Sequence, residues 1–577
     1  MAGTVPHTIM VARPVSAGRT NGRGQLGALA HTRLMMLMLL FAAAVTLVIG
    51  RLAVLAAFGG AEARANVATL ASRGDIVDRN GQPLARTIDA WTIAVHPREI
   101  MGDRMEIAAR LAALMPDRGD QAWFYGQLTK DVSFTYLQRS ASPALVEQVN
   151  ALGEPALVFA RETQRLYPQS TLAAHALGFL SPDGHGMSGM ERVLDTQLLD
   201  PKSNGAPVAL SIDTRVQAAM ESELLRAKTT FAARAAAGLV LDVHTGEVIA
   251  MVSLPTFNPN RVGMSGLDEL RNATTQNVYE LGSTFKPITM ATAIDTGVVS
   301  DMSRRFDATA PLKVGRFTIH DEAGDPKRWL NIPETLIYSS NVATARVADK
   351  LGPERLQAMF RKLGFEGKPD IELKEKGRPL WPTFWARTTT MTTAYGHGIA
   401  ITPLQLANAY ATLVNGGVWR PTTLLKVGPG HPVPAGHRAI SEQTSARMRQ
   451  LLRLIVLKGT GRKAEAPGFR IGGKTGTAEA ASAGGYDKSR NVATFVAAFP
   501  IDRPRYVVLS MLDTPQGTKE TGGWKTAAWN AAPVVGRVVA RVGSMLGVVP
   551  EDGRDIDESD LLPLLWQEPG AKVATSQ

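Results

Sequence analysis

The longest apolar run of the chain lies near its N-terminus. Residues 34–50 carry no charged side chain, and after Arg51 an apolar stretch continues over residues 52–60. As a helix, the first run spans about 25 Å, close to the thickness of a membrane's hydrocarbon core. A cleaved signal peptide is the alternative, because Ala61-Glu62-Ala63 has a small-x-small pattern, but signal cores hold only ~7–15 apolar residues. We therefore predict a retained transmembrane anchor over residues 34–58.

The charges that precede this run predict its orientation. Residues 1–33 contain no acidic residue, and a positively charged arm before a membrane span stays in the cytoplasm. We expect these residues to form a cytoplasmic basic arm, and everything after about residue 60 to lie on the other side of a single-pass anchor. The arginines of the arm are Arg13, Arg19, Arg23 and Arg33.

The segment that follows mixes short strand-like and helix-like pieces with many turn formers. Asn80-Gly81 is a strong signal for a tight turn. Further along, the pattern predicts a strand over residues 208–212 and a helix that begins near Asp213. We expect a first external domain over residues 62–230.

From residue 235 onward, strand patterns stand at both ends of a long segment that is otherwise helical. The first two predicted strands form a hairpin, and the last two are separated by a proline-containing turn. This arrangement predicts an α+β domain over residues 235–550, with a central sheet built from distant parts of the chain. The four predicted strands are 239–243, 248–252, 492–499 and 506–512.

The clearest helix signal of this second domain is a capping box. Thr402 is the predicted N-cap, Pro403 takes the first helical position, and Gln405 takes the third. The helix is predicted to stop at Asn415-Gly416-Gly417. Beyond the domain, the segment 551–577 begins with six acidic residues in ten, so we predict a solvated and mobile acidic tail.

Composition excludes several classes of site. The chain of 577 residues allows three or four domains, and it contains no cysteine, which excludes disulfides and Cys-ligated metals. The ten histidines lack the spacing of a zinc hydrolase, so we expect no metal and no cofactor. The net charge is +11, and four of those charges lie in residues 1–33. The remaining balance is diffuse, which argues against a nucleic-acid partner.

The first candidate for chemistry is Ser283-Thr284-Phe285-Lys286-Pro287. Three residues apart on a helix, the serine hydroxyl and the lysine amine lie on one face. Pro287 is best tolerated in a first turn, which places the helix start close to Ser283. A buried lysine beside a second cation can lose its proton and serve as the base that a serine nucleophile needs. Alone, this spacing also fits an exposed lysine near an N-cap serine.

Two further polar motifs follow at long separations. Ser339-Ser340-Asn341 places a hydroxyl and an amide together on a bend, where they can relay a proton and hold a substrate amide. Lys474-Thr475-Gly476-Thr477 offers a cation and two hydroxyls on a predicted edge strand that an extended peptide can join. Gly476 would let a substrate approach closely. The backbone N–H groups of Ser283 and Thr477 are a candidate oxyanion hole. Singly, these motifs also fit a polar turn and a glycine-rich strand end.

The ordered set is specific where the single motifs are not. Ser-x-x-Lys, Ser-x-Asn and Lys-Thr-Gly in this order form the series of penicillin-binding proteins and class A β-lactamases. From the anchor to about residue 550 the chain resembles a class B penicillin-binding protein, most closely the division-specific, FtsI-type transpeptidases. Other segments that resemble family signatures are Arg73–Ala85, Arg165–Pro168, Ala173–Gly178, Gly186–Glu191 and Tyr395–Gly398.

This resemblance implies an architecture and a compartment. Behind a single transmembrane helix, an elongated, mixed α/β, non-catalytic pedestal of the dimerisation type occupies residues 62–230. A transpeptidase domain of the serine β-lactamase-like fold follows, with a central antiparallel sheet and helices on both sides. The family resemblance places the anchor in the inner membrane and the catalytic domain in the periplasm.

The resemblance also implies peptidoglycan cross-linking at the division septum. Ser283 would attack the carbonyl between the last two D-alanines of a stem peptide, and Lys286 would be the general base. Ser339 would relay the proton to the leaving D-alanine, while Asn341 would orient the substrate.

The third motif would bind the donor peptide. Lys474 would raise the local positive potential, and Thr475 and Thr477 would bind the terminal carboxylate beside Gly476. β-Lactams would acylate Ser283. The implied partners are a membrane-embedded glycan-strand polymerase and other division proteins. The alternatives are an elongation-specific class B transpeptidase, a β-lactamase, a β-lactam sensor, or an anchored division scaffold whose serine site is secondary.

Overall fold

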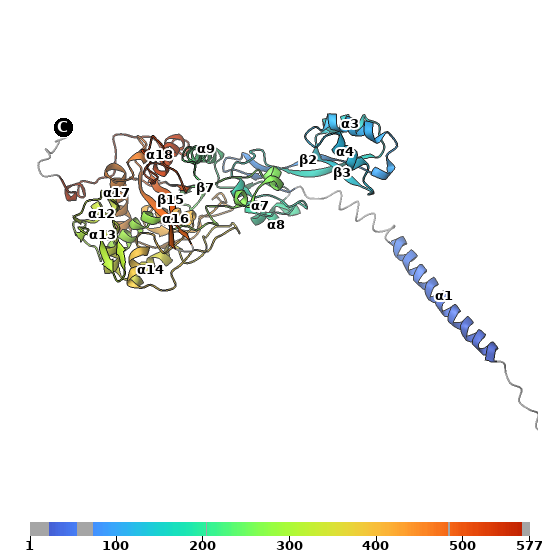
Figure 1. Cartoon of the computed structure of the whole chain (residues 1–577), viewed down its shortest axis with the longest axis horizontal. Helices are drawn as coiled ribbons and strands as arrows, with labels where there is room; N and C mark the ends of the chain where they lie inside the picture. The colour runs from blue at the N-terminus through green and yellow to red at the C-terminus, as the bar shows by residue number, and fades with distance from the viewer. Residues whose placement is uncertain (1–21, 55–72, 204, 483–484, 568–577) are drawn as a thin grey trace, which may run out of the picture. The chain divides into compact units, whose positions relative to one another are not determined.

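The chain forms two compact units, one containing the N-terminal helix and one containing the folded part from Ser72 onward. Figure 1 shows the elements of both. The computed structural model describes residues 22–54, 73–203, 205–482 and 485–567.

The N-terminal unit contains α1 (Gly22–Val54), a helix of 33 residues. Its window Leu34–Arg51 has a mean hydropathy of 2.2 and buries none of its residues, which fits a single membrane anchor. The helix begins twelve residues before the predicted span. The end of the predicted anchor, residues 55–58, and the sequence Ala61-Glu62-Ala63 lie outside the described residues.

The pedestal domain is built around one long strand. The first residues of β2 pair with β1, and its last five residues pair with β3, so this single strand of 13 residues joins the two ends of the domain. The helices near β3 enclose a small apolar core that includes Ile93, Phe124 and Leu137. The elements are β1 (Ile76–Val77), β2 (Pro83–Val95), η2 (Pro97–Glu99), α3 (Arg104–Leu114), α4 (Gln121–Leu128), β3 (Thr135–Ala141), α5 (Pro143–Asn150), β4 (Leu157–Leu166), α6 (Ala174–Leu177), α7 (Gly189–Val193), α8 (Asp195–Leu198), η3 (Pro201–Ser203) and β5 (Val208–Ala209).

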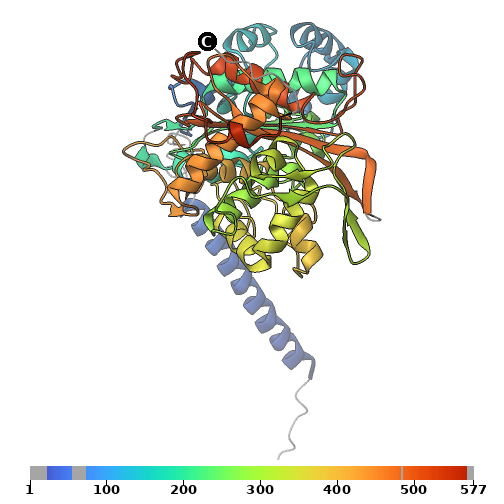
Figure 2. The same cartoon turned by 90° about the vertical axis from the view of Figure 1, so that its left-hand side faces the viewer.

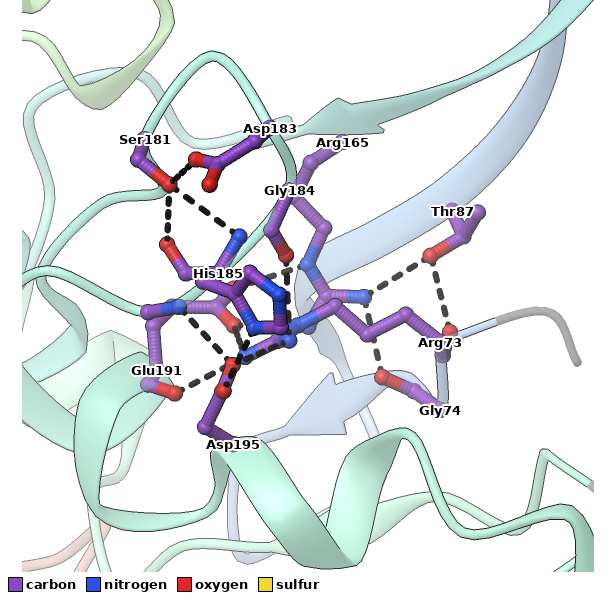
Figure 3. A network of polar contacts seen from close by, with 11 residues as sticks. Arg73, Gly74, Thr87, Arg165, Ser181, Asp183, Gly184, His185, Glu191 and Asp195 are labelled. Atoms are coloured by element: carbon purple, nitrogen blue, oxygen red, sulfur yellow. Dashed lines mark hydrogen bonds and ion pairs between the residues drawn. The ribbon is translucent and has the colours of Figure 1, made fainter. Parts of the chain in front are cut away.

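A buried network of ion pairs and hydrogen bonds connects separate segments of the pedestal (Figure 3). Glu191, which is fully buried, accepts hydrogen bonds from Arg73 Nε at 2.8 Å and from Arg165 Nε at 2.7 Å. Arg73 also reaches Asp195 at 2.7 Å, and Arg165 donates to the carbonyl oxygen of Gly74 at 2.9 Å. Three of the segments that resemble family signatures therefore meet in one network, although they are far apart in the sequence.

Removing the carboxylate of Glu191 should destabilise the folded chain strongly. We expect Glu191→Ala to lower the free energy of unfolding by about 3–5 kcal/mol, because it leaves two buried guanidinium groups without their shared acceptor. Denaturant unfolding followed by circular dichroism measures this change. Glu106→Ala is the matched control: it breaks an exposed pair with Arg110, which we expect to matter by only about 0.5 kcal/mol. Equal effects of the two variants would contradict the prediction.

The second domain is built on a five-stranded antiparallel sheet with the strand order β14-β15-β16-β6-β7. The predicted hairpin and the two later strands are confirmed, and they meet in this sheet. Alternate residues face opposite layers: Leu239 and Leu241 join the core under the larger helical layer, whereas Val240 joins the core under α9 and α18. Figure 2 shows the strands between these two layers. The sheet strands are β6 (Ala235–Asp242), β7 (Val248–Leu254), β14 (Gly472–Ser482), β15 (Gly485–Phe499) and β16 (Tyr506–Asp513).

The remaining elements of this domain are mostly helical, as predicted. The capping box of α16 is confirmed: Gln405 N–H donates to Thr402 Oγ1 at 3.2 Å, and Thr402 N–H donates to Gln405 Oε1 at 3.1 Å. The helices are α9 (Thr214–Thr230), η4 (Pro259–Met264), α10 (Leu267–Leu270), η5 (Gly282–Phe285), α11 (Lys286–Asp295), α12 (Ile332–Ile337), α13 (Asn341–Leu351), α14 (Pro353–Lys362), α15 (Arg387–Thr393), α16 (Pro403–Val414), α17 (Glu442–Lys458), η6 (Arg462–Ala464), α18 (Ala531–Val542) and η7 (Leu562–Leu564), and the short strands are β8 (Phe306–Asp307), β9 (Leu312–Val314), β10 (Phe317–Ile319), β11 (Trp329–Leu330), β12 (Val418–Trp419) and β13 (His437–Arg438).

Helix α9 packs differently from what the predicted domain ranges imply. It falls inside the range 62–230 that was predicted as pedestal, and its N-cap is Asp213 as expected. Yet its apolar face, with Val216, Met220 and Leu224, packs against the catalytic sheet and α18. These side chains recur at helical spacing on one face of α9 and pack on the sheet that follows in the sequence. Helix α9 is therefore a helix of the catalytic domain.

The acidic tail is packed rather than mobile over its described part, so that prediction was wrong up to residue 567. Asp555 pairs with the buried guanidinium of Arg453 on α17 at 2.6 Å. Leu561 is fully buried, and the Trp566 N–H donates to Glu334 at 2.8 Å. Basic groups on the helical surface and scattered apolar residues in the tail outweigh the repulsion between its acids. Residues 568–577 lie outside the described part.

The pedestal is joined to the catalytic domain by specific polar contacts. Asp78, in the predicted turn, accepts from Thr214 N–H at 3.1 Å and from its hydroxyl at 2.8 Å. The backbone of Tyr167 exchanges two hydrogen bonds with the side chain of Asn260, at 3.0 and 2.9 Å. Asp78 and Tyr167 belong to two of the segments that resemble family signatures, so these segments contribute to the contact between the pedestal and the catalytic domain.

Candidate active site

Ser283 lies on a 3-10 turn, η5, directly before helix α11, which begins at Lys286. Pro287 stands in the first turn of α11, so the predicted helix start near Ser283 is close to the observed one. Gly282 has φ +54°, and a Cβ there would lie 2.9 Å from the Thr477 carbonyl oxygen. A glycine is therefore needed where the serine turn packs against strand β14.

The hydroxyl of Ser339 lies between two lysine amines. Lys286 Nζ donates to the Ser339 carbonyl oxygen and, at 3.1 Å, to its hydroxyl oxygen. Lys474 Nζ donates to the same hydroxyl oxygen at 2.9 Å. Ser339 holds φ +61°, a conformation that is strained for a residue other than glycine.

Both lysines are fully buried, and burial changes their charge. Burial lowers the pKa of Lys286 to about 7, although the carboxylates of Asp321, Asp325 and Glu322 raise it. Burial and then repulsion from Lys286 lower the pKa of Lys474 well below its usual range. The two amines therefore do not both carry a charge in the free site at neutral pH.

The third motif lies on β14, which is an edge strand as predicted. Lys474 Nζ also donates to the Thr475 carbonyl oxygen at 3.0 Å, and the Thr475 hydroxyl contacts that of Thr460 at 2.6 Å. The Thr477 hydroxyl accepts from Ala527 N–H at 3.1 Å. A Cβ on Gly476 would lie 2.4 Å from the Leu281 carbonyl oxygen. The contact that requires glycine here is with the protein's own serine turn, in addition to any approach of a substrate.

Asn341 is the first residue of α13, and Ser340 is its N-cap. The Asn341 side-chain amide donates to the His320 carbonyl oxygen at 2.9 Å, which fixes its orientation. Among the described residues, Ser283 Oγ makes no hydrogen bond, and the amine of Lys286 is directed to Ser339 instead. The structure thus brings the serine, the two lysines and the Ser-x-Asn motif to one end of β14. It also shows residues that the sequence analysis did not select, His320 and Asp321, because no local pattern marks a loop that reaches the site through tertiary contacts.

A serine before a helix, with two buried lysine amines and an edge strand beside it, is an arrangement suited to serine acyl transfer with a lysine as the base. Among the described residues, no group of three or more histidine or acidic side chains is placed to hold a metal. Residues 236–534 match the penicillin binding protein transpeptidase domain, and residues 68–199 match the penicillin-binding protein dimerisation domain. The chain belongs to the class B penicillin-binding proteins.

Relatives of known name cover most of the chain. It is 40% identical over 491 residues to the probable peptidoglycan D,D-transpeptidase FtsI of Caulobacter vibrioides, covering 83% of this chain and 82% of that protein. It is 30% identical over 518 residues to the peptidoglycan D,D-transpeptidase FtsI of Escherichia coli K12, covering 83% and 84%. Among solved structures, penicillin-binding protein 3 of Mycobacterium tuberculosis complexed with aztreonam matches with a TM-score of 0.65 and 26% identity, over 85% of this chain and 99% of that chain. The ampicillin complex of that protein matches with a TM-score of 0.66 and 27% identity, over 85% and 98%.

Proposed function

We propose that this protein is a division-specific peptidoglycan D,D-transpeptidase that cross-links stem peptides through a serine acyl-enzyme and releases the terminal D-alanine. The observation that carries the proposal is the Ser339 hydroxyl held between the buried amines of Lys286 and Lys474, beside Ser283. The FtsI names of the relatives support the division role over the elongation role. The apolar helix α1 supports a single-pass anchor in the inner membrane, with a cytoplasmic N-terminus and a periplasmic catalytic domain.

In the first half-reaction, Ser283 Oγ attacks the carbonyl carbon between the last two D-alanines, and Lys286 accepts the hydroxyl proton. The backbone N–H groups of Ser283 and Thr477 stabilise the oxyanion that forms. As the C–N bond breaks, Ser339 donates its proton to the leaving amine and regains one from Lys286, which took it from Ser283. Asn341 holds the amide of the donor peptide. Atoms and charges balance, because the proton taken from the serine leaves on D-alanine.

The terminal carboxylate of the donor peptide accounts for the hydroxyls and the cation of the third motif. Thr475 and Thr477 offer hydroxyls to it, and a nearby negative charge favours the protonated form of Lys474. Binding of the donor therefore restores the positive charge that burial removes in the free site. The protonated Lys474 then strengthens the polarity of the Ser339 O–H and its donation to the leaving group.

In the second half-reaction, the amine of a neighbouring stem peptide attacks the acyl-enzyme. The new amide bond forms as the ester bond to Ser283 breaks, and the serine recovers its proton through Lys286. A β-lactam enters the first half-reaction as a donor mimic, but its leaving group stays attached after ring opening. We propose that a glycan-strand polymerase in the membrane and other division proteins are the partners that present the strands.

Intact-mass spectrometry of the full chain after exposure to benzylpenicillin tests this function. A stable adduct of one drug molecule is expected, because a transpeptidase lacks an efficient water for deacylation. Rapid drug hydrolysis without an adduct would favour a β-lactamase. A folded protein that neither forms an adduct nor hydrolyses the drug would overturn the assignment and favour the scaffold alternative. Release of D-alanine from a pentapeptide stem, with formation of a cross-linked dimer, separates transfer from simple acylation.

A further inference from the structure

A loop outside the three motifs accepts three hydrogen bonds, from the last two residues of the Ser339-Ser340-Asn341 motif and from Val342, which follows it. This loop follows β10 and begins with His320 and Asp321. Asp321 Oδ2 accepts from the Ser340 hydroxyl at 2.7 Å, and Asp321 Oδ1 accepts from the Val342 N–H at 2.9 Å. The His320 carbonyl oxygen accepts from the Asn341 side-chain amide at 2.9 Å. Two consecutive residues of the loop therefore bind three consecutive residues, 340–342, at the start of α13.

The carboxylate of Asp321 completes the cap of α13. The Ser340 hydroxyl accepts from the Ala343 N–H at 3.0 Å while it donates to Asp321, so one oxygen links the helix to the loop. The Val342 N–H is a second free donor of the first helical turn, and a carboxylate is favoured at that end of the helix. Ser340 is fully buried, which leaves this segment little freedom to shift.

We propose that Asp321 is a positioning residue of the active site, which holds Ser340 and Val342 so that the Ser339 hydroxyl stays between the two lysine amines. This inference rests on the proposed function of that site. Ser339 has a left-handed backbone, and such a conformation persists only where its surroundings hold it. Asp321 restrains this conformation through its hydrogen bonds to Ser340 and Val342, which lie one and three residues after Ser339.

Asp321 also acts on the base through its charge. Burial is the main influence on Lys286, and Asp321 is the strongest of the carboxylates that raise its pKa against burial, ahead of Asp325 and Glu322. The other titratable groups that face Lys286 are Lys474 and His397, and burial lowers the pKa of His397 to about 4, so it is neutral near pH 7. Loss of the Asp321 charge therefore moves the pKa of Lys286 below about 7.

The test is the second-order rate of acylation of the full chain by benzylpenicillin, measured from pH 5.5 to pH 9. We expect Asp321→Ala to lower the plateau rate at high pH by about 10–100-fold, because the hydrogen bonds from Ser340 and Val342 are lost. Asp321→Asn keeps the shape and one acceptor, so a loss of about 3–10-fold is expected. In both variants the midpoint of the pH profile should move to lower pH, which a merely structural role would not cause.

Glu322→Gln is the matched control, because it removes a charge from the same loop and its side chain makes no hydrogen bond to the motif among the described residues. Its plateau rate should stay within about twofold of wild type, since the geometry of Ser339 is kept. Plateau rates and midpoints of both Asp321 variants equal to wild type would overturn the inference while leaving the proposed function intact. A wild-type chain that benzylpenicillin does not acylate would instead overturn the proposed function. Asp321→Asn decides the question if Asp321→Ala does not fold.

Discussion

Replacing Ser283 by alanine is expected to abolish acylation by benzylpenicillin, with a fall in rate of at least about 10⁴-fold. The variant lacks the atom that forms the ester, and the other hydroxyl of the serine turn, that of Thr284, is fully buried and donates to the Leu281 carbonyl oxygen. The fold should be retained, because among the described residues Ser283 Oγ makes no hydrogen bond. Intact-mass spectrometry of the drug-treated variant measures the loss.

Ser265→Ala is the control for this prediction, since it removes a hydroxyl at the end of η4, from a residue outside the three motifs. It should form the same adduct as wild type at the same rate, and the thermal midpoints of both variants should match that of wild type. An adduct on Ser283→Ala would show that a different residue is the nucleophile, and peptide mapping would then identify it.

Local patterns in the sequence were sufficient for the elements whose signals lie within a few residues. The capping box at Thr402 and Gln405 predicts α16 because each partner of the box is three residues from the other. The hairpin of β6 and β7 follows from two continuous apolar runs around a short turn. The site could also be predicted as a set of residues, because the order of three motifs is specific even though each motif is weak.

Features that depend on distant contacts were not predictable in this way. The tail after residue 550 reads as a solvated acidic segment, yet Asp555 is bound by Arg453, a residue about a hundred positions earlier. Likewise, α9 follows the pedestal in sequence but packs on the catalytic sheet. Asp321 lies eighteen residues before Ser339, and only the fold places its carboxylate at the cap of α13. In each case the partner is chosen by tertiary packing, which periodicity and spacing do not describe.

Replacing Lys286, the proposed base, is expected to have the second large effect on the rate of acylation. Lys286→Gln should lower the rate of acylation by about 10³-fold at pH 8, because the amide side chain keeps the size and polarity but cannot accept the serine proton. An ordinary lysine with a pKa of ~10.4 is only about 0.04% free amine at pH 7. Burial lowers the pKa of Lys286 to about 7, so roughly half of it is free amine at that pH.

The lowered pKa of Lys286 also determines the direction in which the acylation rate changes with pH. Because the unprotonated amine is the base, the wild-type rate should rise about tenfold per pH unit below pH 7 and level off above it. Lys286→Gln should lose this dependence together with the rate, whereas Lys350→Gln, on the far end of α13, should change neither. Stopped-flow acylation from pH 5.5 to pH 9 distinguishes the outcomes. If Lys286→Gln keeps the wild-type profile and Lys474→Gln loses it, the base is Lys474, and the proton of Ser283 travels through the Ser339 hydroxyl that both amines contact.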